Sequence, residues 1–373
     1  MVLLIGNYPA DQQQSMQRFG TMMLQGLNAA GIEAELIQPQ SFFGKIKFAG
    51  DFVSKWLAYV DKFLLFPRRL RRKLSQAVEI VHICDHSNAI YTKEIGTMPV
   101  VVTCHDLLAV RGALGEETDC PATFTGKFFQ RWILEGLKRA TAIACVSNAT
   151  LRDAERLVIR HGGRPELRVI PNGLNYSYRK QPPEVARERL NGILDLNRPF
   201  VLHVGSNLRR KNREGVLRSF ALTKNDWKGR LVLAGDPMNN ELRSLGENLG
   251  IVDRVVEVIN PDSVILEALY SSAVALLYPS RFEGFGWPII EAQACGCPVI
   301  CSNREPLPEV AGDAALFREI DDEPGFATDI LRLLDPAERE CWSEKSLRNA
   351  ERFTAAKMIS RYIGLYRELG ARV

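Results

Sequence analysis

The sequence predicts an α/β protein built from two doubly wound domains of parallel strands, and three observations lead to this prediction. The chain has 373 residues, which is enough for two domains of ordinary size. Short runs rich in Val and Ile alternate with amphipathic stretches of helical pattern, as in parallel sheets that are buried on both faces. These runs form two series, and a segment with two adjacent prolines and many charges separates them.

The first series starts at the N-terminus. Its expected strands are 2–6, 34–38, 80–84, 100–104, 142–146 and 167–171. Asn172-Gly173 is a dipeptide typical of turns, so the first domain is expected to span 1–174. The next segment, 175–199, is expected to be a linker because its prolines and charges interrupt the strand pattern.

The second series starts at Phe200. Its expected strands are 200–205, 230–235, 255–259, 273–280 and 298–302. We expect this domain to span 200–355. The pattern of the final segment, 356–373, indicates a helix that can cross back to the N-terminal domain.

Composition excludes several classes of protein. The hydrophobic share of 46% and the charged share of 25% are those of a globular chain, not of a disordered or fibrous one. No apolar run of about 18 residues predicts a transmembrane helix, and the N-terminus lacks a signal-like basic region. Eight cysteines stand mostly in apolar runs without zinc-site spacing, so we expect free, buried thiols and a cytoplasmic location.

One segment, 41–75, concentrates basic charge. It holds nine Lys or Arg, two Asp and eight aromatic residues. A basic and aromatic segment of partly helical pattern is typical of a contact with an anionic membrane. The alternative is a helix whose aromatic face packs into its own domain while its basic residues are solvated. Nucleic acid is not expected as a partner, because no nucleic-acid-binding motif accompanies the patch.

The carboxyl ends of the strands are where open α/β sheets bind ligands. After the strand 200–205 comes SNLRRKN, in which Arg209, Arg210 and Lys211 suit a phosphate group. The alternative is a solvated cluster in a loop. Neither half carries a G-x-G-x-x-G or P-loop motif, which disfavours a nicotinamide dehydrogenase.

The stretch SRFEGFGWPIIEAQACGCPVI follows the strand 273–280. Pro288 suits the first position of a helix, and Glu291 would then fall in its first turn. Gly284 and Gly286 allow backbone N–H groups to approach an anion at the helix N-terminus. Glu283 lies eight positions before Glu291, so the two carboxylates could bracket a ligand. The alternative is a helix cap and a surface glutamate.

Together these residues resemble the retaining GT-B glycosyltransferases of family four. The E-x7-E element stands as Glu283 to Glu291, VGSNLRRKN resembles the diphosphate-binding loop, and TCHDL places His105 at the family's active-site histidine. The resemblance covers nearly the whole chain and is strongest over 200–317. It implies a GT-B fold, in which an N-terminal acceptor-binding domain and a C-terminal nucleotide-sugar-binding domain, both Rossmann-like, face each other across a cleft.

The resemblance also implies roles for residues. Glu291 would bind the ribose, Glu283 the donor sugar, and Arg210 and Lys211 the diphosphate, while His105 would sit beside the sugar. The implied catalytic residues are His105, Glu283, Arg210 and Lys211. The implied donor-binding residues are Gly205, Ser206, Arg210, Lys211, Phe285, Gly286, Trp287 and Glu291. The implied acceptor-side residues are Asn7, Ser15 and Asp106; the loop Pro9–Ser15 departs from the family because it lacks paired glycines.

The implied reaction is transfer of a hexose, with retention, from a nucleotide-diphosphate sugar to an acceptor hydroxyl in polysaccharide or glycolipid synthesis. GDP-mannose is the favoured donor and a UDP-sugar the second. The acceptor would be a carbohydrate or lipid-linked, which would place the protein peripherally on the inner face of the membrane. No cofactor or metal is expected, because no D-x-D element stands in a fitting place. The alternatives are a catalytically silent nucleotide-sugar-binding protein, a GT-B epimerase and a starch-type synthase.

Overall fold

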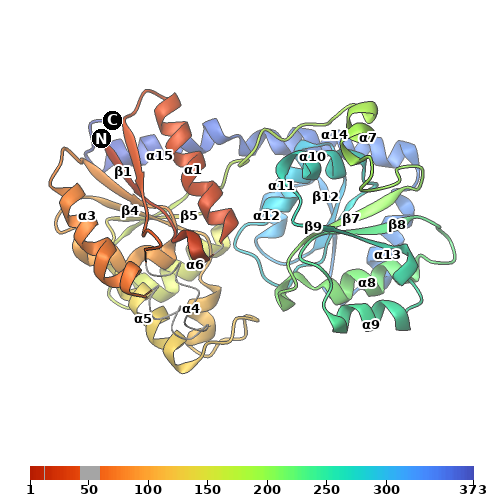
Figure 1. Cartoon of the computed structure of the whole chain (residues 1–373), viewed down its shortest axis with the longest axis horizontal. Helices are drawn as coiled ribbons and strands as arrows, with labels where there is room; N and C mark the ends of the chain where they lie inside the picture. The colour runs from red at the N-terminus through yellow and green to blue at the C-terminus, as the bar shows by residue number, and fades with distance from the viewer. Residues whose placement is uncertain (12, 43–58) are drawn as a thin grey trace. The chain divides into compact units, whose positions relative to one another are not determined.

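The computed structural model describes residues 1–11, 13–42 and 59–373. It divides into two compact units, shown in Figure 1 with colour running from red at the N-terminus to blue at the C-terminus. Unit 1 comprises Met1–Asn175 and Ala355–Val373, and unit 2 comprises Tyr176–Thr354. Each unit contains one parallel sheet of six strands.

The sheet of unit 1 has the strand order β2-β1-β3-β4-β5-β6. Its strands are β1 (Val2–Ile5), β2 (Ala34–Ile37), β3 (Ile80–Ile83), β4 (Val100–Cys104), β5 (Ala142–Cys145) and β6 (Glu166–Val169). The α-helices are α1 (Gln14–Ala29), α3 (Phe66–Leu74), α4 (Leu108–Ala113), α5 (Phe124–Lys138), α6 (Asn148–Ala154) and α15 (Ala355–Glu368). Shorter 3-10 or π turns are η1 (Pro9–Asp11), η3 (Asp61–Leu65), η4 (His86–Glu94) and η5 (Glu155–Ile159). Every residue of β1, β3, β4 and β5 is buried, as their Val/Ile-rich sequences predict.

The C-terminal helix α15 belongs to unit 1 although 179 residues of unit 2 precede it in the chain. A buried chain of polar contacts holds it there. His82 on β3 lies 2.7 Å from the Thr103 hydroxyl and 2.6 Å from the Tyr366 hydroxyl, and Thr103 lies 2.7 Å from the Tyr362 hydroxyl. Burial lowers the pKa of His82 to about 3, so this histidine is neutral in the folded protein.

The sheet of unit 2 has the strand order β12-β11-β10-β7-β8-β9. Its strands are β7 (Phe200–Gly205), β8 (Arg230–Gly235), β9 (Val255–Ile259), β10 (Leu276–Tyr278), β11 (Val299–Ser302) and β12 (Ala315–Arg318). The α-helices are α7 (Pro183–Leu190), α8 (Arg213–Leu222), α9 (Asn240–Asn248), α10 (Ser263–Ser272), α11 (Trp287–Ala294), α12 (Leu307–Ala311), α13 (Glu323–Arg332) and α14 (Pro336–Ala350). Short 3-10 turns are η6 (Arg209–Lys211), η7 (Val252–Arg254) and η8 (Glu351–Phe353).

Three features of unit 2 differ from the sequence-based expectations. The strand β12 was not expected, because its four residues include Arg318 and only its first residue is fully buried. The segment 175–199 is not a free linker: from Tyr176 it belongs to unit 2, where Leu190 and Ala186 of α7 are buried. The strand expected over 273–280 is only three residues long, and the residues around it form loops.

The structure also bears on the expectations for the cysteines and for membrane-spanning helices. All eight cysteines are free; six are buried, whereas Cys120 is half-buried and Cys341 exposed. Within 1–11, 13–42 and 59–373, no helix combines the length and the apolar character needed to cross a membrane. The basic and aromatic segment 41–75 lies partly outside the described residues, which include its positions 41–42 and 59–75.

Candidate active site

The topology of unit 2 creates a place for a ligand between β7 and β10. These strands are neighbours, and the strand order runs in opposite directions from them, which makes this pair the topological switch point of the sheet. Ligands of open α/β sheets bind beyond the carboxyl ends of the strands at such a point. The loops that follow the two strands are 206–212 and 279–286, and they contain the residues that the sequence predicts for a phosphate and a sugar.

Glu283 is the centre of a charged cluster between these two loops. Lys211 Nζ donates to Glu283 Oε1 at 2.6 Å, and Arg210 donates through its guanidinium to Glu283 Oε2 at 3.1 Å. The Tyr278 hydroxyl, at the end of β10, also donates to Glu283 Oε1 at 2.7 Å. The structure therefore brings Arg210, Lys211 and Glu283 together, although more than 70 positions separate the cations from the carboxylate.

Two opposing effects set the pKa of Glu283 in this cluster: its burial and its pairing with two cations. The side chains of Glu283 and Lys211 are only 7% and 11% exposed. Burial alone would raise the pKa of Glu283, but Lys211 and Arg210 outweigh it and hold that pKa at about 2. Burial and the neighbouring carboxylate raise the pKa of Tyr278 well above its usual value, so its hydroxyl stays protonated as a donor. The cluster carries one net positive charge over the whole neutral range.

Backbone contacts fix the two loops on each other. Asn212 adopts the left-handed conformation at φ 53° and caps α8 by accepting from the Gly215 N–H at 3.3 Å. Its amide also donates to the Pro279 carbonyl at 3.1 Å, and the Arg281 N–H donates to the Arg210 carbonyl at 2.7 Å. The turn that carries the cations is thus held in place before any ligand binds.

A buried arginine supports the start of the same loop. The Arg213 guanidinium donates to the Gly205 carbonyl at 2.6 Å, and to the Asp236 carbonyl and the Asn207 side chain at 2.7 Å each. Gly235, at φ 128°, approaches so closely that a β-carbon there would lie 2.3 Å from the Gly205 carbonyl oxygen. A pocket of about 280 Å³ adjoins this loop and is lined by residues that include Asn207, Arg209, Arg213, Asn239 and Arg281.

The second glutamate of the E-x7-E element is placed differently from the expectation. Helix α11 begins at Trp287, so Pro288 is its second residue and Glu291 lies beyond the first turn. Glu291 is 5% exposed and accepts a hydrogen bond of 2.9 Å from the Tyr270 hydroxyl of α10. The expectation that Glu291 lies in the first turn is therefore wrong, because the helix begins one residue earlier than expected.

The residues between the two glutamates form the N-terminus of α11. Gly286 caps the helix at φ 99°, a conformation that favours glycine. The Phe285 ring is buried and packs edge-on against Phe353, with ring centroids 5.7 Å apart, and Trp287 is half-buried. These contacts fix the backbone of the loop beside Glu283. Ser206, like Gly205, lies half-buried in the loop after β7.

Unit 1 has a corresponding switch point, between β1 and β3. Asn7 follows β1 and donates through its amide to the buried carboxylate of Asp85, which follows β3. The Ser87 hydroxyl donates to the same carboxylate at 2.6 Å, and His86 Nδ1 lies 3.1 Å from it. Burial opposes ionisation of both partners, yet each favours the charged form of the other: the pKa of Asp85 lies well below, and that of His86 above, its usual value.

His105 lies beside this cluster, directly after β4. It is buried, donates from Nε2 to the Cys84 carbonyl at 3.0 Å, and packs edge-on against Phe19 with ring centroids 4.8 Å apart. Burial lowers the pKa of His105 despite the nearby Asp85, so it is neutral at pH 7. The Asp106 carboxylate accepts from the Leu108 N–H at 3.1 Å. Ser15 is exposed in the first turn of α1.

Sequence reasoning missed Asp85, His86 and Tyr278. The first two follow a predicted strand directly, in the run IVHICDHS, and the rule about carboxyl ends of strands could have identified them. Tyr278 was hidden inside an apolar run, where a tyrosine has no distinguishing pattern. Among the described residues, no group of three or more His, Cys, Asp or Glu is arranged to hold a metal ion.

Comparison with known sequences gives a consistent result for both units. Residues 16–178 match the family Glycosyltransferase Family 4, and residues 186–347 match Glycosyl transferases group 1. The chain is 30% identical to O-antigen chain mannosyltransferase B of Escherichia coli over 253 residues, 65% of each chain. It is 29% identical to D-inositol 3-phosphate glycosyltransferase of Acidothermus cellulolyticus over 306 residues, 76% of this chain and 66% of that protein. The matches thus span slightly less than two thirds of these relatives.

Solved structures resemble the whole chain. Sucrose-phosphate synthase from Thermosynechococcus elongatus superposes with a TM-score of 0.77 at 21% identity. The match covers 99% of this chain and 98% of the synthase chain. HepE from Anabaena, in complex with UDP and glucose, has a TM-score of 0.73 at 16% identity, with coverages of 98% and 99%. At these identities the likeness concerns the fold, and it confirms the predicted pair of Rossmann-like domains of the GT-B class.

Proposed function

We propose that this chain is a glycosyltransferase with a family 4 half and a group 1 half, and that it moves a hexose from a nucleotide-diphosphate sugar to an acceptor hydroxyl. The observation that carries the proposal is the cluster of Arg210, Lys211, Tyr278 and Glu283 at the switch point of unit 2. A site of this kind is suited to an anionic leaving group beside a polar sugar.

Arg210 and Lys211 would stabilise the negative charge that a glycosyl transfer creates on its leaving group. As the bond to the sugar breaks, negative charge develops on the departing diphosphate. Arg210 and Lys211 are positioned before the reaction, in a turn that Asn212 and Arg281 hold against the second loop. Preorganised charge of this kind stabilises a transition state without reorganisation. Glu283 keeps the two cations oriented while the site is empty of donor, and it then faces the sugar hydroxyls.

The remaining assignments follow the family pattern. Phe285, Gly286 and Trp287 would offer backbone N–H groups to the sugar or phosphate, and Gly205 and Ser206 belong to the diphosphate loop. Glu291 is assigned to the ribose. Glu291 is 5% exposed, and its Oε2 accepts a hydrogen bond from the Tyr270 hydroxyl, which fixes the orientation of the carboxylate.

The donor that we favour is GDP-mannose, with a UDP-sugar second. The support is the mannosyltransferase of Escherichia coli at 30% identity. A thermal-shift series with GDP, UDP and ADP tests the base, since a ligand that binds only the folded protein raises its melting temperature by mass action. GDP should give the largest shift, and a larger shift with UDP or ADP would overturn the preference.

We further propose that the reaction retains the anomeric configuration and uses no divalent metal. In this proposal the leaving phosphate, held by Arg210 and Lys211, helps to accept the proton of the acceptor on the same face of the sugar. The neutral His105 of unit 1 is assigned to the sugar side. Proton NMR of the product formed with the accepted donor reads the configuration directly, and an inverted product would exclude this mechanism.

The acceptor is proposed to be a carbohydrate or a lipid-linked glycan, and the segment 41–75 a contact with an anionic membrane. A basic surface gains about 1 kcal/mol per Lys or Arg near such a membrane, screened by salt. Sedimentation with vesicles containing phosphatidylserine should show binding that falls as salt rises. Absence of binding at low ionic strength would leave the segment as a packed helix with a solvated face.

One experiment separates an enzyme from a silent binding protein. The purified chain is incubated with a panel of nucleotide sugars and scored for slow release of free sugar as well as transfer. A transferase should hydrolyse its own donor slowly, and the Lys211→Ala variant should not. Binding of one nucleotide sugar without any release, in wild type and variant alike, would favour the silent protein instead.

A further inference from the structure

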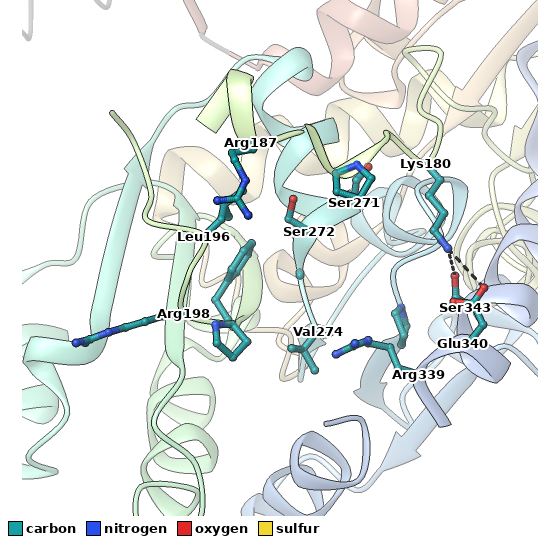
Figure 2. Close-up of a pocket in the computed structure, with 16 residues that line it drawn as sticks. Lys180, Arg187, Leu196, Arg198, Ser271, Ser272, Val274, Arg339, Glu340 and Ser343 are labelled. Carbon is teal, nitrogen blue, oxygen red and sulfur yellow. Dashed lines mark hydrogen bonds and ion pairs between the residues drawn. The ribbon is translucent and has the colours of Figure 1, made fainter. Parts of the chain in front are cut away.

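A second pocket, of about 390 Å³, lies in unit 2 and is shown in Figure 2. Pro199, Val274 and Pro298 line it, and they stand just before β7, β10 and β11. The candidate active site uses the carboxyl ends of these parallel strands, whereas this pocket is at their amino ends. No step of the proposed reaction uses it.

Basic side chains dominate the lining of this pocket. Lys180, Arg187, Arg198 and Arg339 contribute to it, and Glu340 is its one acidic residue. Lys180 lies 3.7 Å from the Glu340 carboxylate and donates to the Ser343 hydroxyl at 3.2 Å, so these two charges offset each other. In Figure 2 Arg187 and Arg339 point toward the space beside Ser272 and Val274, whereas Arg198 extends away from it.

The two converging arginines lack a counter-charge in the part of the chain that the structure describes. The guanidinium of Arg339 has no hydrogen bond or ion pair there, and that of Arg187 has one long contact, 3.4 Å from the Asn197 side chain. Helices α10 and α11 end at the pocket, and each C-terminus carries about half a negative charge. Together they offset about one of the two positive charges. The pocket thus keeps an excess of positive charge that an anion would neutralise.

We infer that this pocket binds a small phosphorylated metabolite through its phosphate group. Guanidinium groups match phosphate oxygens with paired hydrogen bonds, and the Ser272 hydroxyl stands beside them. The volume suits a molecule of the size of a sugar phosphate, because small-molecule pockets begin at about 300 Å³. A concave site with two converging arginines favours a sugar phosphate. An extended polyanion would instead need a broad basic surface.

The position of the two arginines indicates an effector. Arg187 is on α7, the first helix after the chain enters unit 2 at Tyr176. Arg339 is on α14, which ends four residues before the chain leaves unit 2 at Thr354. A phosphate bound by both residues ties together the two segments by which unit 2 is covalently joined to unit 1. The inference does not depend on the proposed reaction.

Calorimetric titration of the full chain tests the site, with glucose 6-phosphate and inorganic phosphate as probes in a chloride buffer. Wild type should bind glucose 6-phosphate saturably. Arg339→Gln should weaken binding about tenfold, since a hydrogen-bonded charge is lost, and Arg187→Gln/Arg339→Gln should lose it. Arg348→Gln is the matched control, because Arg348 is on the same helix, is 67% exposed and faces Glu344 instead of the pocket.

Lys211→Gln separates this pocket from the candidate active site, and it should leave binding of glucose 6-phosphate unchanged. Loss of binding in Lys211→Gln would assign the probe to the active site and overturn the inference. So would binding that persists in the double variant, or no saturable binding by wild type at millimolar probe. Melting curves check folding, and if the double variant does not fold, Arg339→Gln alone decides. Inorganic phosphate binding as tightly as glucose 6-phosphate would overturn the sugar-phosphate assignment, because the rest of the pocket would then contribute nothing.

Discussion

The two units hold a buried carboxylate at the same topological position but surround it with different charges. In unit 2 the carboxylate is Glu283, and its partners Lys211 and Arg210 are always cationic. In unit 1 it is Asp85, and its partner His86 loses its charge as the pH rises. The switch point of a parallel sheet thus provides a place for a polar site, and the side chains there decide whether its charge is permanent or titratable.

This difference suits two tasks. A permanent excess of positive charge suits the binding of a diphosphate, which is anionic at every physiological pH. A carboxylate and histidine pair beside a neutral His105 suits the handling of hydroxyls and protons. The comparison yields four predictions, in order of decreasing effect.

Lys211→Ala should have the largest effect, because it removes a fixed charge that faces the developing diphosphate. Loss of one preorganised stabiliser typically costs about a hundredfold or more in turnover. Steady-state kinetics with the accepted donor measure it. Arg209→Ala is the control, because Arg209 is exposed and belongs to the same turn. Equal small losses at both positions would mean that Lys211 does not face the diphosphate and only pairs with Glu283.

Glu283→Gln should lower turnover more than affinity, by about ten- to a hundredfold, because the neutral amide no longer balances the cations or the charge on the sugar. Glu291→Gln should mainly raise the donor KM, since a ribose contact is made equally in the ground and transition states. His105→Ala should resemble Glu283→Gln. The roles are wrongly assigned if Glu291→Gln abolishes turnover at constant KM while Glu283→Gln stays near wild type.

His86→Asn should change how stability depends on pH, with a smaller effect. The pKa of His86 is raised in the folded state, so its contribution is complete below about pH 6.5 and is lost as the pH rises through the folded pKa. Asp85 has the opposite sign, since its lowered pKa gives stability that is lost only in acid. Urea midpoints between pH 6 and 8 should therefore fall more in wild type than in His86→Asn. Parallel curves would show that the pair is not titratable in this range.

EDTA should have the smallest effect, leaving the rate unchanged. The charge of the diphosphate is assigned here to Arg210, Lys211 and the N-terminus of α11. Initial rates with EDTA, and with Mg²⁺ or Mn²⁺ added back, check this. A strict requirement for either ion would show that the permanent charge of unit 2 is insufficient for the leaving group.

Much of the fold could be predicted because it follows from local pattern. Eleven of the twelve strands lie within about three residues of the expected runs, since Val and Ile in short uninterrupted runs stay buried in a parallel sheet. Arg210, Lys211 and Glu283 could be named from the sequence because the loops that carry them directly follow such runs. The strand β12 was missed because it is only four residues long, ends in Arg318 and is buried only at its first residue.

The sequence by itself therefore determined the strands, the two-domain class and the identity of the charged residues, all of which depend on neighbours a few positions apart. Only the tertiary structure decided which of these residues meet. It placed Tyr278 beside Glu283, turned Glu291 toward Tyr270, brought α15 back to unit 1 and gathered Arg187 and Arg339 at one pocket. These contacts join segments that lie far apart in the chain, and their geometry depends on strand order, which no local pattern encodes.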